Sequence, residues 1–244
     1  MKKFLINEYG KELGEKIYKQ QQERLYTLVN QSNGKSKSQL KALKNVILPP
    51  IALYQTLQEL PIDKESALQV VEKSIFQGAQ RTANLINRIE KLPCFYKIFS
   101  KIFNKALKAD NWEIEYEQND SDAMIFTIKK CLWYDTCLEH NCPELCAAFC
   151  KSDNLTYDSM KKITFRRTQT LGMGGEYCDF KFINNNIKWP FFQIKDYCNL
   201  IVTLCNNFVT KPPPRLAIIN YKLLKLGGVN RWKIFSSVDQ KSLY

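Results

Sequence analysis

The chain contains 244 residues, of which 45% are hydrophobic and 25% are charged, and its formal net charge is +12. This length suits one large domain or two small ones, and the composition excludes a disordered chain. So strong a positive charge favours an acidic partner, such as nucleic acid, an anionic membrane, a carrier protein or a carboxylate substrate. The alternative is a lysine-rich surface that serves only solubility.

The N-terminal segment has only a short apolar stretch before Asn7, whereas the core of a signal peptide needs roughly 7–15 apolar residues. No window approaches the roughly 18 uninterrupted apolar residues of a membrane span. We therefore expect a cytoplasmic protein without membrane contact, whose nine cysteines are mostly reduced thiols available for metal binding, catalysis or burial. Nucleic acid is disfavoured as a partner, because the basic residues are spread out and form no recognised motif.

The first part of the chain has the pattern of successive helices. Residues 11–31 carry apolar side chains at roughly helical spacing among lysines and glutamates. The next apolar segment is interrupted by Pro49-Pro50, a pair that can end one helix and start another. A further helix is expected over 64–90. Residues 94–108 predict an amphipathic basic helix whose aromatic stripe should face the core rather than a membrane.

The pattern changes near residue 110. Apolar and acidic residues alternate over 112–117, which predicts a half-buried strand, and a turn at 119–122 leads into a second strand over AMIFTIKKCLW. A short helix is expected over 143–152, with proline in its first turn. The segments KKITFRRTQTL and EYCDFKFI should then form a second hairpin around the glycine turn at 172–175.

This order of elements predicts an α+β fold, with a helical N-terminal half packed on a small antiparallel sheet built from two hairpins. We divide the chain into a helical region (1–110), an α+β core (111–184) and a C-terminal helical and basic extension (185–244), together forming one compact domain. Within the extension, DYCNLIVTLCNNF has a helical pattern, and the prolines at 212–214 should form a rigid spacer.

Six of the nine cysteines and the only histidine lie between residues 131 and 178. A structural zinc site usually takes its ligands in close pairs, but no Cys-x-x-Cys pair is present. Cys142, Cys146 and Cys150 instead recur every four residues along the predicted helix, which is typical of small buried hydrophobic side chains. No metal or cofactor is therefore expected.

Nucleophilic catalysis fits the cluster better. A thiolate can attack a C=N or C=O carbon when a neighbouring base or a helix N-terminus lowers its pKa. His140 is the only imidazole, and Cys178 follows the glycine turn, where the N–H groups of Gly174 and Gly175 could stabilise an oxyanion. The alternatives are an exposed loop histidine and a buried strand cysteine.

Three carboxylates are candidates for orienting the imidazole: Glu139, Asp153 and Asp179. Of these, Asp179 adjoins Cys178 in the predicted strand. Because neighbouring side chains on a strand point to opposite faces, Cys178 and Asp179 should not act as one hydrogen-bonded pair.

The string RTQTLGMGGEYCDFKF, from Arg167 to Phe182, together with a PEL helix and the Cys-x-x-Asp step of Cys150 and Asp153, resembles the L-2-amino-thiazoline-4-carboxylic acid hydrolase family. The resemblance covers roughly residues 40–183. It implies hydrolytic opening of a thiazoline ring that bears a carboxylate. It also implies that Arg166 or Arg167 contacts that carboxylate, and that Cys150, Thr168, Thr170, Gly174 and Gly175 belong to the binding site.

Three functions remain open, and we favour an enzyme. The first is a cysteine hydrolase acting on a C–N bond. The second is an acyltransferase that forms an amide from an acyl thioester held on an acidic carrier protein, a partner that would account for the positive charge. The third is a non-catalytic ligand-binding domain, because the glycine turn followed by Cys-x-Phe also resembles 4-vinyl-reductase-type domains.

Overall fold

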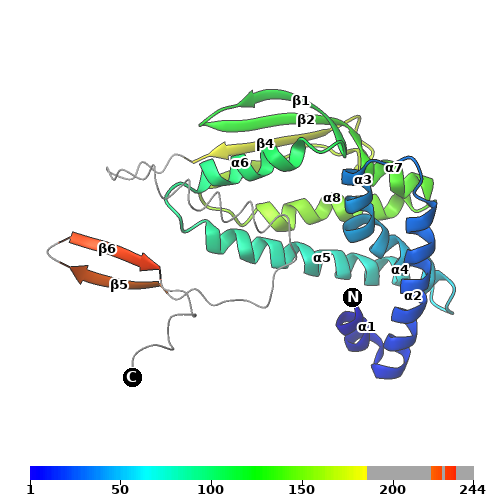
Figure 1. Cartoon of the computed structure of the whole chain (residues 1–244). Helices are drawn as coiled ribbons and strands as arrows, with labels where there is room; N and C mark the ends of the chain where they lie inside the picture. The colour runs from blue at the N-terminus through cyan, green and yellow to red at the C-terminus, as the bar shows by residue number, and fades with distance from the viewer. Residues whose placement is uncertain (186–220, 227–228, 235–244) are drawn as a thin grey trace, which may run out of the picture. The chain divides into compact units, whose positions relative to one another are not determined.

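A computed structural model describes residues 1–185, 221–226 and 229–234. The chain divides into two compact units, Met1–Ile194 and Lys195–Tyr244. The first unit is α+β, as predicted, with helices packed on a four-stranded antiparallel sheet (Figure 1). In chain order its elements are α1 (Lys2–Tyr9), α2 (Lys11–Gln31), α3 (Lys37–Ala42), α4 (Leu48–Gln58), α5 (Lys64–Ile89), α6 (Phe95–Leu107), β1 (Trp112–Asn119), β2 (Ala123–Cys131), α7 (Leu132–Glu139), α8 (Pro143–Tyr157), β3 (Ile163–Arg166) and β4 (Cys178–Asn184).

The two longest helices, α2 and α5, begin and end within one residue of where the sequence pattern predicts. Helix α2 coincides with the expected range, and α5 begins after Asp63, whose carboxylate accepts a hydrogen bond from the Ser66 N–H at 2.9 Å. Such a cap satisfies one of the free N–H groups of the first helical turn. The aromatic stripe of α6 faces the core, as expected: the rings of Phe99 and Phe103 lie 5.1 and 5.0 Å from that of Phe182 on β4.

Pro49 and Pro50 do not separate two helices. Residues Leu43–Ile47 form a π-helical turn that continues α3 directly into α4, and the prolines lie in the first turn of α4. Because a first-turn residue needs no intrahelical N–H bond, proline is tolerated there. The Gln21 side chain on α2 donates to the Pro49 carbonyl at 3.1 Å, which fixes α2 against this turn.

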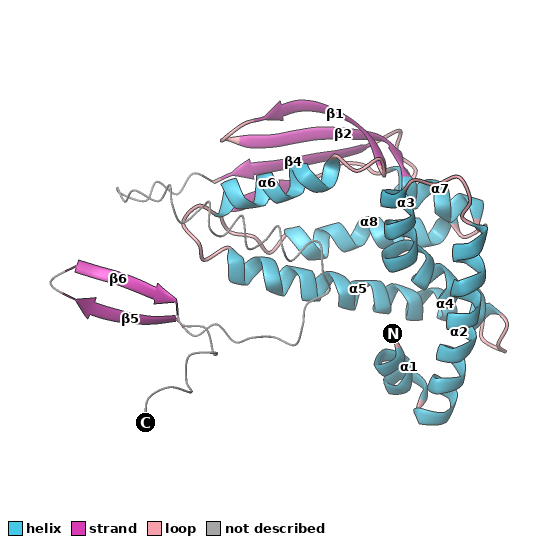
Figure 2. Ribbon diagram, viewed as in Figure 1, coloured by secondary structure: helices cyan, strands magenta, loops and turns pink. Residues whose placement is uncertain are grey.

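The sheet has the strand order β1-β2-β4-β3, so the two predicted hairpins join through β2 and β4. Helices α6 and α8 cover one face, and α5 packs against α8 (Figure 2). The inward side chains of β2 and β4 meet there, and the rings of Phe126 and Phe180 stack at 5.2 Å. This face and the helices beneath it form one hydrophobic core, and α1, α2, α4, α5, α7 and α8 enclose a second.

Three boundaries differ from the prediction. Strand β3 ends at Arg166, five residues before the expected end of the strand at Leu171. Strand β2 ends at Cys131, and the next residues form helix α7 rather than extending the strand. Helix α8 continues to Tyr157, one turn and more beyond the expected end at residue 152. This longer α8 places Asp153 and Asn154 on the helix, facing the loop that follows β3.

The second unit contains an antiparallel hairpin of β5 (Tyr221–Leu226) and β6 (Val229–Ile234). The predicted helix DYCNLIVTLCNNF and the spacer at 212–214 lie outside the described residues. Among the helices that the structure describes, none combines the length and the apolar character needed to traverse a bilayer.

Candidate functional site

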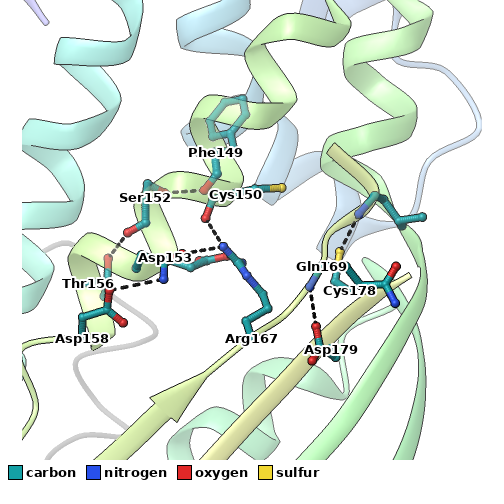
Figure 3. A network of polar contacts seen from close by, with 12 residues as sticks. Phe149, Cys150, Ser152, Asp153, Thr156, Asp158, Arg167, Gln169, Cys178 and Asp179 are labelled. Carbon is teal, nitrogen blue, oxygen red and sulfur yellow. Dashed lines mark hydrogen bonds and ion pairs between the residues drawn. The ribbon is translucent and has the colours of Figure 1, made fainter. Parts of the chain in front are cut away.

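The site lies where α8 faces the loop between β3 and β4, and Arg167 holds the two together (Figure 3). Its guanidinium donates to the Asp153 carboxylate at 2.8 Å, to the Cys150 carbonyl at 2.6 Å and to the Asn154 side-chain oxygen at 2.7 Å. All three acceptors belong to α8. Arg167 therefore fastens the C-terminal half of α8 to the end of β3.

Arg167 is buried, with 5% of its side chain exposed. Its guanidinium lies 5.3 Å from the ring centre of Phe180 and 5.8 Å from that of Phe165, distances at which a cation is attracted to a ring face. The resemblance implied that an arginine here contacts a substrate carboxylate. In the structure Arg167 already pairs with Asp153, whereas Arg166 is exposed.

Asp153 is the carboxyl group of the site that can exchange a proton near neutral pH. Burial raises its pKa to about 6, although the Arg167 guanidinium acts in the opposite direction. The side chain keeps 34% of its surface exposed, so protons can reach it from solvent. A carboxyl group with these properties is suited to general acid–base catalysis.

Cys178 is the first residue of β4, and it is buried with 5% of its surface exposed. Its sulfur accepts a hydrogen bond from the Leu171 N–H at 3.3 Å. Burial raises the pKa of the thiol to about 11; the Leu171 N–H and the Arg167 charge lower it, and Asp153 raises it. The resting group is therefore a thiol, and the charges of Arg167 and Asp153 act on its pKa in opposite directions.

Two other thiols, those of Cys131 and Cys150, lie near Cys178. All six cysteines from Cys131 to Cys178 are free. A hydrogen bond with Cys146, together with burial, raises the pKa of the half-buried Cys150 thiol, and burial raises that of Cys131 to about 12. In the described part of the chain, no group of three or more histidine, cysteine or acidic side chains is placed to hold a metal ion.

The glycine turn does not offer the oxyanion donors that the sequence predicted. The N–H of Gly174 donates to the Leu171 carbonyl at 3.2 Å, and that of Gly175 donates to the Thr170 carbonyl at 2.9 Å. Gly174 has a φ of 85°, a left-handed conformation that favours glycine. These amides close the turn, so the loop amide that contacts the Cys178 sulfur is that of Leu171, which the sequence analysis missed.

The loop before the turn is fixed by Asp179. Its carboxylate accepts the Thr168 and Gln169 N–H groups, both at 2.8 Å, and the Thr168 hydroxyl at 3.0 Å. Thr170, next in the loop, is buried, and its side chain contacts the Cys150 thiol, whose pKa this contact lowers. Asp179 thus orients this loop and not, as the sequence suggested, an imidazole.

His140 is not part of this cluster. It ends α7, and its charged neighbours are Glu139 and Lys35. Burial lowers its pKa. Helix α8 begins three residues later, and Asp153 lies ten residues along it, about 15 Å at a rise of ~1.5 Å per residue. His140 and Asp153 therefore lie toward opposite ends of α8.

The sequence of the part of the chain that contains the site matches one known family. Residues 40–182 match the model of the L-2-amino-thiazoline-4-carboxylic acid hydrolase family, and this range includes Asp153, Arg167 and Cys178. No curated protein and no solved structure matches the chain. Because the matched range covers more than half of the chain, the protein belongs to the L-2-amino-thiazoline-4-carboxylic acid hydrolase family.

Proposed function

We propose that the protein hydrolyses the amidine carbon of a 2-aminothiazoline carboxylate, with Cys178 as nucleophile and Asp153 as general acid and base. The observation that carries the proposal is that one loop contacts both groups: its Leu171 N–H donates to the Cys178 sulfur, and its Arg167 binds the Asp153 carboxylate. The family supports hydrolysis and names the substrate class. The thiol, the carboxyl group and the buried Thr170 hydroxyl supply the polar groups that such a substrate would meet.

The magnitude of the thiol pKa determines how the nucleophile is activated. With a pKa of about 11, roughly one thiol in 3,000 is ionised at pH 7.5, so a preformed thiolate would cost about 5 kcal/mol. Proton transfer that accompanies attack avoids this cost. Asp153, with a pKa of about 6, is ionised at that pH and can accept the proton. No hydrogen bond joins the two side chains, so the proposal requires solvent to carry the proton between them.

Atoms and protons are conserved in each step of this reaction. The Cys178 sulfur bonds to the amidine carbon while its proton passes to Asp153. The bond between that carbon and the ring sulfur breaks, and Asp153 returns the proton to the departing sulfur. Water then attacks the same carbon, again with Asp153 as base, and Cys178 leaves as a thiol. The product is an N-carbamoyl cysteine, which carries a free thiol.

The test combines turnover with trapping of the intermediate. The purified protein is mixed with L-2-aminothiazoline-4-carboxylate, product is quantified by chromatography, and the intact protein is weighed after an acid quench. Because the ring opens without losing atoms, the wild-type protein should gain the full mass of the substrate at Cys178. The Cys178→Ala protein should show neither adduct nor turnover, whereas Cys142→Ala should retain both.

Two outcomes would contradict the proposal. If the Cys178→Ala protein turned over the substrate at a rate close to that of wild type, Cys178 would not be the nucleophile, and direct attack by water would be favoured. Absence of turnover together with acylation of Cys178 by an acyl thioester on a carrier protein would favour amide formation instead.

A further inference from the structure

Backbone pairing between β3 and β4 stops before the site, and beyond that point the Asp179 carboxylate binds the chain that follows β3. The last pair in register is Arg166 with Lys181. Two residues further along, Thr168 would face Asp179, but here the Asp179 side chain rather than its backbone bonds the Thr168 and Gln169 N–H groups. The carboxylate therefore turns the chain out of the ladder at this position.

The consequence of this turn appears three residues later. The Leu171 N–H donates to the Cys178 sulfur, 3.3 Å away. Asp179 and Cys178 are adjacent on β4 and project to opposite faces. Both side chains nevertheless bind backbone N–H groups of the loop between β3 and β4. Asp179 is only 7% exposed, and the hydrogen bonds of its side chain go to Thr168 and Gln169.

From these contacts we propose that Asp179 is a positioning residue, which holds the Leu171 N–H on the Cys178 sulfur and keeps that thiol covered. This inference rests on the proposed function only in that Cys178 is the nucleophile there. Burial alone would raise the pKa of Asp179, but the hydrogen bonds from Gln169 and Thr168 lower it below its ordinary value. The carboxylate thus stays ionised and bonded throughout the neutral range.

The role depends on hydrogen-bond geometry rather than on charge. An asparagine at position 179 keeps an oxygen for the two N–H groups, and its amide can donate to the Thr168 hydroxyl. An alanine removes all three bonds. The conservative variant should therefore restore what the alanine variant loses.

The experiment measures the reactivity of individual cysteines in the intact protein. Wild-type, Asp179→Ala and Asp179→Asn proteins are treated with iodoacetamide across pH 7–10, and alkylation of each cysteine is quantified by peptide mass spectrometry. Because burial is the largest cause of the raised Cys178 pKa, a released loop should expose the thiol. We expect alkylation of Cys178 to become at least tenfold faster in Asp179→Ala and to remain within threefold of wild type in Asp179→Asn.

Two controls separate local release from unfolding. Cys137 is fully buried in the other hydrophobic core, so its alkylation should stay slow in every variant. Asp120 caps the β1–β2 turn in the same manner, accepting the Asp122 and Ala123 N–H groups at 2.8 and 3.0 Å. Asp120→Ala should therefore leave the reactivity of Cys178 unchanged.

Turnover gives the second readout. On the substrate of the proposed function, kcat of Asp179→Ala should fall while alkylation of Cys178 rises, and Asp179→Asn should recover most of kcat. Unchanged alkylation of Cys178 in Asp179→Ala, or equal effects of alanine and asparagine, would overturn the inference. Because alkylation needs no substrate, this result stands even if the proposed reaction fails.

Discussion

Replacing Arg167 by methionine should destabilise the protein by about 3 kcal/mol, because a partner of a buried ion pair is lost. The guanidinium is 5% exposed and makes three hydrogen bonds to α8. Loss of one partner of a fully buried pair costs about 3–5 kcal/mol. Asp153 keeps a third of its side chain in solvent, so the low end of this range applies.

Urea unfolding monitored by circular dichroism at pH 7.5 measures this loss. Arg166, the neighbouring residue on β3, is exposed, and Arg166→Met should change stability by less than about 0.5 kcal/mol. Arg167→Lys tests whether charge alone suffices. An ammonium cannot reproduce the fork of donors, so most of the loss should persist.

The loss should also depend on pH. The folded-state pKa of Asp153 lies above its ordinary value, and without Arg167 it should rise further. The unpaired carboxylate then destabilises the folded protein above that pKa, and the penalty disappears as pH falls toward the unfolded value near 4. The effect of Arg167→Met should therefore be smaller at pH 5 than at pH 7.5. Equal stability losses for Arg166→Met and Arg167→Met at pH 7.5 would refute the reasoning.

Three further changes test other parts of the fold by thermal and urea unfolding. A Cβ on Gly172 would lie 2.6 Å from the Cys146 sulfur. Gly172→Ala should therefore destabilise the protein by about 1–3 kcal/mol, and Cys146→Ala should restore part of this loss. Unchanged stability of Gly172→Ala would contradict the contact. Tyr54→Phe removes the hydroxyl that donates to Glu144 at 2.6 Å and should cost about 1.5 kcal/mol, whereas no change would show that solvent replaces the bond. Asp63→Ala removes the α5 cap and should lower the urea midpoint, with a smaller loss at a pH low enough to protonate the carboxyl; an unchanged midpoint would contradict the cap.

The elements that the sequence predicted well are those with a sustained period. Helices α2 and α5 show it over many residues, and the alternation in β1 and β2 identifies the first hairpin. Helix α7 escaped prediction because Leu132–Glu139 follows the strand directly and no cap separates them. The end of α8 was placed too early because Ser152, Asp153 and Asn154 are typical of helix ends. Arg167, distant in sequence, stabilises Asp153 and Asn154 on the helix.

For the candidate site, several side chains that the sequence singled out lie close together in the structure, but the contacts between them could not be foreseen. Cys150, Asp153, Arg167, Thr170 and Cys178 do gather on facing elements. The sequence suggested His140 as the base because it lies among the cysteines along the chain. In the structure, however, His140 precedes the N-terminus of α8, whereas Asp153 lies in the C-terminal half of that helix. The amide of Leu171 carries no side-chain signature, so no sequence pattern could have revealed it.

The pH dependence of the first turnover tests the central claim most directly, since it reports how the Cys178 thiol is activated. The rate of adduct formation should rise through a pKa of about 6 as Asp153 ionises, and it should then stay level from about pH 7 to pH 9. The Asp153→Asn protein should react about 10²–10⁴-fold more slowly and lack the rise near pH 6. A rate that instead climbs tenfold per pH unit toward pH 11 in both proteins would show that attack requires a preformed thiolate, and it would contradict the role of Asp153.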